Sequence, residues 1–101
     1  MEKSLVYEVN IDIEVELTKK FEAWLLPHIE EVLATGAFLR AHTFKRDGAH
    51  DGFSGYTIQY FTRSEKALEQ YLADRAPVLR RDAEILFGSH FKAFRRVLRE
   101  F

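Results

Sequence analysis

The sequence contains no cysteine. Disulfide frameworks, thiolate nucleophiles and cysteine-based zinc sites are therefore excluded. A large charge imbalance is also missing, because the formal net charge is −1 at pH 7. Overall attraction to nucleic acid or to an anionic membrane is consequently not indicated, although the net charge does not exclude a local charged patch.

Long apolar stretches are also lacking. No apolar run is long enough to span a bilayer, and the opening segment, MEKSLVYEVN, lacks the apolar centre of a secretory signal. A cytoplasmic protein is the expectation. The sequence also lacks nucleophilic triads, phosphate-binding loops and dinucleotide glycine fingerprints, so no motif indicates a particular reaction.

What the sequence does contain is apolar and aromatic bulk. Hydrophobic residues make up 47% of the 101 residues, and nine of them are phenylalanines. This composition predicts one packed globular domain over residues 1–101 rather than a disordered chain. It also supplies more apolar bulk than one small sheet face normally needs.

Residues 5–15 alternate between apolar and polar, the period of a half-buried strand. The next segment, 18–35, has apolar residues at helical spacing. We expect Thr18 to cap this helix and Gly36 to end it. Pro27 lies inside the pattern and predicts a kink or a restart, because proline removes a helical N–H bond.

The remaining segments complete a recognisable order. Three further strands are expected at 37–46, 54–61 and 90–99, with a hairpin loop at 46–52 that is rich in Asp and Gly. Ser64 is the expected cap of a second helix, which restarts at Pro77. The order βαββαβ predicts a ferredoxin-like α+β fold, an antiparallel four-stranded sheet with two kinked or split helices on one face.

The stretch SGYTIQYF, Ser54 to Phe61, resembles a strand motif of RNA-recognition domains, which share this topology. Those domains stack bases on aromatic residues of the helix-free sheet face. The segment VYEVNI, Val6 to Ile11, resembles the companion motif on the first strand of those domains. In this chain Tyr7 of that segment shares its face with the apolar residues of the first strand, and Tyr56 and Tyr60 share theirs with Ile58. These tyrosines are therefore predicted to pack against the helices, which leaves RNA binding as the least favoured alternative.

The same register predicts what the helix-free face presents. From the first and third strands it should carry Glu8, Asn10, Asp12, Thr57, Gln59 and Phe61. If Leu39 and Ala41 face the helices, the second strand adds Phe38, Arg40, His42 and Phe44. The last strand is mixed on both faces and does not reveal its orientation. Such a face is too apolar to stay bare, so we expect a homodimer in which two sheets face each other.

Four segments together resemble a small uncharacterised bacterial family, DUF family 4286, which is grouped with ferredoxin-like, dimeric α+β barrel proteins. They are WLLPHIEEVLATGAF, YTIQYF, YLADRAPVLR and FGSHFKAFRRVL. The likeness extends from Val6 to Leu98. It implies the fold and a homodimeric barrel, and it supplies no reaction.

We expect the space between two facing sheets to hold a pocket for a small molecule. The candidate ligand-binding residues are Asn10, His42, Gln59 and Arg95. His42 is the histidine placed to act as an acid or base there. For the other three, the alternative is cross-strand hydrogen bonding, with a salt bridge to Glu8 or Asp12.

The phenylalanines predicted at the dimer interface are Phe38, Phe44 and Phe61. No pair of the four histidines has the spacing of a metal site, so we expect no metal, and we expect no haem or flavin. The favoured hypothesis is a homodimer that binds a small molecule. A structural or protein-interaction dimer without a ligand is the alternative, followed by a cofactor-free enzyme and an RNA binder.

Overall fold

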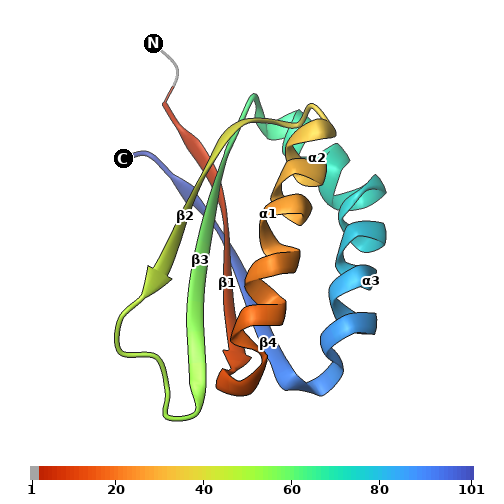
Figure 1. Ribbon diagram of the computed structural model, residues 1–101. Coiled ribbons are helices and arrows are strands. Elements are labelled where there is room, and N and C mark those ends of the chain that lie inside the picture. Colours follow the sequence, from red (N-terminus) through yellow and green to blue (C-terminus); the bar gives the residue numbers. More distant parts are fainter. Residues whose placement is uncertain (1–2) are drawn as a thin grey trace.

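The computed structural model describes residues 3–101 and forms two layers (Figure 1). One layer is a sheet of four strands: β1 (Leu5–Glu14), β2 (Phe38–Arg46), β3 (Phe53–Thr62) and β4 (Phe91–Arg99). The other layer holds α1 (Thr18–Ala34), α2 (Glu65–Asp74) and α3 (Ala76–Phe87). Short 3-10 turns, Val15–Leu17 and Gly88–His90, follow β1 and α3. Among residues 3–101, no helix combines the length and the apolarity needed to cross a membrane.

The strands follow the order β2-β3-β1-β4, and every neighbouring pair is antiparallel. All helices cover one face of this sheet, so the other face is free of helices (Figure 1). The predicted ferredoxin-like α+β fold is confirmed. The central strands are β1 and β3, and they set the register of both faces.

The core lies between the sheet and the helices and is rich in aromatic rings. Tyr7, Tyr56 and Tyr60 are each less than 5% exposed. Tyr7 stacks on Tyr60 and on Phe38, with ring centroids 6.2 Å apart in both pairs. Such pairs contribute roughly 0.5–1.5 kcal/mol each beyond the burial of their area. The tyrosines of the RNA-like motif are therefore core residues, as the register predicted.

Helix α1 differs from the sequence-based prediction in two places, at Pro27 and at its N-terminal cap. It runs without a break from Thr18 to Ala34, so the expected restart at Pro27 is wrong. Pro27 is exposed, and the apolar stripe continues past it with Phe21, Leu25 and Ile29 buried. Packing of this stripe outweighs the roughly 3 kcal/mol that an interior proline costs a helix. Thr18 does not cap the helix; its hydroxyl donates to the carbonyl of Val15 instead.

The second helical region is split in two, as predicted. The side chain of Ser64 caps α2, because its Oγ accepts a hydrogen bond from the amide of Ala67 at 3.0 Å. Pro77 lies in the first turn of α3, where a missing N–H removes no helical bond. Gly88 ends α3 with a positive φ of 51°.

The start of β2 contains an irregularity that changes which side chains face the helices. The pairing of β2 with β3 shifts register between Phe38 and Arg40. Phe38 therefore turns into the core, where it is 4% exposed, and Leu39 is left 56% exposed. The prediction that Phe38 belongs to the helix-free face and the dimer interface is wrong for this reason. Beyond the bulge, His42 and Phe44 keep their expected side.

Candidate functional site

The helix-free face is organised in rows that cross all four strands. The central row contains His42, Gln59, Glu8 and Arg96. The next row contains Phe44, Thr57, Asn10 and Phe94. Asn10, His42 and Gln59 are thus brought together as predicted, and β4 turns Phe94 and Arg96 toward this face.

Glu8 is the centre of this face and is only 3% exposed. It accepts hydrogen bonds from Gln59 Nε2 at 3.0 Å, from Asn10 Nδ2 at 3.0 Å and from Arg96 Nε. Burial alone raises the pKa of Glu8, but these donors favour the charged form and together hold its pKa below the ordinary value. The carboxylate is thereby neutralised within the chain.

The amide groups of Asn10 and Gln59 both have partners inside the protein. Besides their bonds to Glu8, Asn10 Oδ1 accepts from the hydroxyl of Thr57 at 2.7 Å. This is the cross-strand alternative for these two residues. His42 is exposed and lies beside Phe61, with ring centroids 5.0 Å apart. Ligand binding by these three residues stays a prediction.

Arg95 does not join them. It pairs with Val9 on the helix-facing side of the sheet, so the prediction that it lies with Asn10 and Gln59 is wrong. Because strand side chains alternate, the choice of Arg96 for the helix-free face sends Arg95 to the other one. The mixed pattern of β4, an edge strand, left this orientation undetermined.

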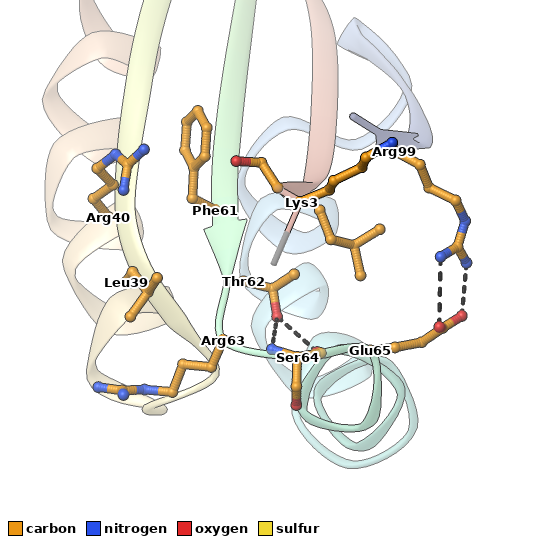
Figure 2. A pocket seen from close by; sticks show the side chains of 11 residues that line it. Lys3, Leu39, Arg40, Phe61, Thr62, Arg63, Ser64, Glu65 and Arg99 are labelled. Atoms are coloured by element: carbon orange, nitrogen blue, oxygen red, sulfur yellow. Dashed lines mark hydrogen bonds and ion pairs between the residues drawn. The ribbon is translucent and has the colours of Figure 1, made fainter. Parts of the chain in front are cut away.

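A cavity of about 430 Å³ lies at one end of the sheet (Figure 2). We call it the end pocket. Its lining consists of Lys3, Ser4, Leu5, Leu39, Arg40, Phe61, Thr62, Arg63, Ser64, Glu65 and Arg99. Arg40 and Phe61 also belong to the helix-free face, so the end pocket adjoins that face.

The end pocket is strongly cationic. Among residues 3–101, four basic side chains line it against one carboxylate, that of Glu65. Figure 2 shows Arg99 reaching from β4 to Glu65 at the start of α2, where two hydrogen bonds join them at 2.6 and 3.4 Å. This pairing lowers the pKa of Glu65 and fixes one side of the pocket.

Two arginines of the end pocket have no carboxylate partner within 4 Å among residues 3–101. Arg40 lies over the ring of Phe61, with its guanidinium carbon 4.1 Å from the ring centroid. Arg63 donates its Nε to the carbonyl of Gly36 at 3.0 Å. The remaining donors of both guanidinium groups are available to an anion.

Sequence reasoning missed the end pocket, although a signal for it exists. In an antiparallel sheet of this order, β1 and β2 begin where β3 and β4 end. Lys3, Arg40, Arg63 and Arg99 all lie within two residues of these four strand ends. Once the topology is known, basic residues at these strand ends can be placed together at one end of the sheet.

A second cavity, the helix–sheet cleft, lies between the sheet and the helices α1 and α3. Its volume is about 40 Å³, and its polar lining residues include Tyr7, His28, Arg80 and Arg95. Arg80 Nη2 donates to the hydroxyl of Tyr7 at 2.8 Å. Desolvation lowers the pKa of half-buried His28 and also that of Arg95, which lines the cleft while remaining exposed to solvent.

Comparison with known proteins agrees with the fold. Among solved structures, a conserved protein of unknown function and possible oxidoreductase from Bacteroides thetaiotaomicron aligns with a TM-score of 0.69 and 9% identity, over 98% of this chain and 99% of the other. SnoaB, a cofactor-independent oxygenase from Streptomyces nogalater, gives 0.68 and 13% over 94% and 91%. A de novo designed protein, Foldit4, gives 0.63 and 11% over 94% and 96%.

These structures define the class of the chain as ferredoxin-like α+β proteins. The chain belongs to the family described as Domain of unknown function (DUF4286), which matches residues 4–101. The resemblance seen in the sequence is therefore confirmed. A search of curated proteins found no match. Because a designed protein shares the architecture, function has to be argued from the site.

Proposed function

We propose that the protein is a sheet-to-sheet homodimer that binds a small organic anion in the end pocket. The dimer is supported by the exposed aromatic residues of the helix-free face. Phe44 is 50% exposed and Phe94 is 54% exposed, and they lie in one row on the two edge strands. A second copy of this face would cover these rings. It would meet a central row in which Glu8 is already neutralised by Arg96.

The observation that carries the ligand proposal is the cationic lining of a cavity of about 430 Å³. That volume falls in the usual range of small-molecule sites, roughly 300–1,000 Å³. Arginine guanidinium groups match the planar geometry of carboxylates and phosphates. Phe61 and Leu39 add apolar surface to the lining, so the proposed ligand combines an anionic group with a flat apolar part.

The dimer and the ligand site are connected by position. Arg40 and Phe61 belong both to the end pocket and to the helix-free face. A second sheet packed on that face would therefore border the pocket. The proposal keeps the sequence-based hypothesis that a ligand binds near the inter-sheet space. It places that ligand at one end of the sheet instead of in the central row.

Binding, rather than catalysis, is what the lining supports. The hydroxyl-bearing residues include Ser64, whose Oγ is committed as the cap of α2. No histidine lines the end pocket to act as its general base. The oxygenase activity of SnoaB belongs to a protein that is 13% identical, a likeness that supports the shared fold alone.

A ligand screen by thermal shift tests the proposal. The panel contains benzoate, salicylate and phenyl phosphate at matched ionic strength. We expect at least one member to stabilise the wild-type protein in a saturable way. Arg40→Gln and Arg63→Gln should each abolish most of that shift, because each removes an unpaired cation of the end pocket.

The matched control is Arg81→Gln, since Arg81 is an exposed arginine of α3 outside the end pocket. It should keep the full shift. If no panel member shifts the melting temperature, or if Arg40→Gln and Arg63→Gln keep the shift, the ligand proposal fails. A dimer that binds none of these anions would favour the alternative of a purely structural or protein-interaction module.

A further inference from the structure

The helix–sheet cleft holds two arginines without a counter-ion. Arg80 comes from α3 and Arg95 from β4, and both line this cavity. Among residues 3–101, neither lies within 4.0 Å of a carboxylate. Arg80 is half-buried and Arg95 is exposed, so water reaches both guanidinium groups, while the two like charges still repel each other across the cleft. The lowered pKa of Arg95, caused by desolvation and by nearby Arg80, agrees with this repulsion, which an anion between them would relieve.

The hydroxyl of Tyr7 adds a donor to the same space. Tyr7 is 4% exposed, and its oxygen accepts the bond from Arg80 at 2.8 Å. Because that bond uses a lone pair of the oxygen, the phenolic proton remains free to be donated. Arg80 and Tyr7 are thus held by one another in an arrangement whose unused donors belong to a common cavity.

A further polar atom in this cavity lacks a partner. His28 stacks on Trp24 with ring centroids 4.3 Å apart, and both line the cleft. Its Nδ1 is buried and has no hydrogen-bond partner in the part of the chain that the structure describes. A buried polar atom without a partner is costly, so its presence points to a water or a solute in the cleft.

The size of the cleft limits what it can hold. A cavity needs roughly 10–15 Å³ of free volume for each water that it holds. Its volume of about 40 Å³ therefore admits a few waters or one very small solute. Apolar side chains, among them Val9 and Ile58, complete the lining.

We propose that the helix–sheet cleft binds one small planar oxyanion, such as formate, acetate or nitrate, between Arg80 and Arg95. The anion receives charge-assisted hydrogen bonds from the two guanidinium groups and one from the hydroxyl of Tyr7. It neutralises the arginine pair and links α3 to the edge strand β4. This site lies on the opposite face of the sheet from Glu8 and does not depend on the end pocket.

Thermal shift with salts of different anion size tests the proposal. Formate, acetate and nitrate are titrated as sodium salts, with sodium gluconate as the bulky control at equal ionic strength. We expect a saturable rise of about 5 °C at roughly ten times Kd for at least one small anion. Gluconate should give no such rise, because it exceeds the cavity of about 40 Å³.

Variants then locate the effect. Arg95→Gln should remove the anion-induced rise, and Arg80→Gln serves as a second variant that removes the other cation. Arg81→Gln, on the neighbouring exposed position, should keep it. Arg40→Gln should keep it too, which separates this site from the end pocket.

Three results would overturn the inference. One is the absence of a saturable rise with all three small anions in the folded wild-type protein. A second is a rise that persists in both Arg80→Gln and Arg95→Gln. A rise lost in Arg40→Gln and kept in Arg95→Gln would assign the small anion to the end pocket and would also overturn it.

Discussion

Glu8 is the residue on which the polar part of the helix-free face depends. It is buried on the face that carries no helix, and three neighbouring side chains donate to it. The apolar surroundings and the donors act in opposite directions on its charge, and the donors prevail. Such a network favours a single register of β3, β1 and β4, because a one-residue slip would separate Glu8 from Gln59 on β3 or from Arg96 on β4.

Acid titration should reveal this network. Because the folded-state pKa of Glu8 is lowered, its stabilising contribution is present above the unfolded pKa, about 4.5, and is lost as pH falls through the folded-state value. The difference in free energy of unfolding between wild type and Glu8→Gln should therefore be largest near neutral pH and shrink below about pH 4.5. Denaturant unfolding across this range measures it at fixed protein concentration.

Glu84→Gln is the control for that experiment, since Glu84 is exposed on α3. It should follow the pH dependence of the wild type. A Glu8→Gln variant that runs parallel to wild type at all pH values would show that the network does not bias the protonation of Glu8.

Gln59→Ala removes one donor from the same carboxylate. We expect the free energy of unfolding to fall by about 1–2 kcal/mol, because a hydrogen bond to a charged, buried group is lost. Thr43→Ala, at an exposed position of β2, should change it by less than about 0.5 kcal/mol. Chemical denaturation measures both, and an unchanged Gln59→Ala would contradict the role of this bond.

The same variant also tests the sequence-based hypothesis of a ligand in the central row. If Gln59 binds the ligand, Gln59→Ala should abolish the thermal shift produced by it. If the ligand occupies the end pocket instead, the shift should survive in Gln59→Ala and be lost in Arg63→Gln.

At the scale of whole elements, α1 shows how packing overrides local preference. Pro27 is exposed, whereas the stripe on the opposite side is buried against the sheet. The helix therefore continues through a residue that weakens it. Proline costs an isolated helix about 3 kcal/mol relative to alanine, but it also restricts the unfolded chain.

Pro27→Ala should accordingly stabilise the protein. We expect the free energy of unfolding to rise by about 1–2 kcal/mol, because the helix regains an N–H donor and loses the clash with the preceding turn. Thermal and chemical denaturation measure the change. Pro77→Ala is the comparison, and it should stabilise little or not at all, since Pro77 lies in the first turn of α3. Destabilisation by Pro27→Ala would mean that proline restricts the unfolded chain more than it weakens α1.

For the whole molecule, the main prediction is the oligomeric state, which depends on the helix-free face. In a homodimer built on it, each of the two copies contributes Phe44 and Phe94 to the same symmetric surface. We expect sedimentation at micromolar concentration to give twice the chain mass of 11.9 kDa. Phe94→Glu should weaken the dimer about tenfold or more, because it places a charge in the apolar part of the interface twice.

The control is Val78→Glu, since Val78 is 68% exposed on α3, away from the helix-free face. This variant should remain dimeric. A wild-type monomer at micromolar concentration would remove the dimer from the proposed function. Dissociation by Val78→Glu with an intact Phe94→Glu dimer would assign the interface to the helices.

The parts of the fold that follow from short-range rules were predictable from the sequence. The alternation of residues 5–15 predicted which side chains of β1 point toward the helices, because side chains of a strand alternate strictly between the two faces. The register placed Tyr7 and Tyr60 in the core and Gln59 on the helix-free face, and Ser64 was recognisable as a cap from its position alone.

The element order, the core face of the central strands and the family could thus all be predicted from the residues. The three-dimensional arrangement set the features that depend on distant neighbours. It turned Phe38 inward through a bulge, carried α1 past Pro27 and sent Arg95 into the helix–sheet cleft. It also gathered basic residues from four strand ends into the end pocket. These features arise from pairing and packing between segments far apart in the chain, which no local periodicity encodes.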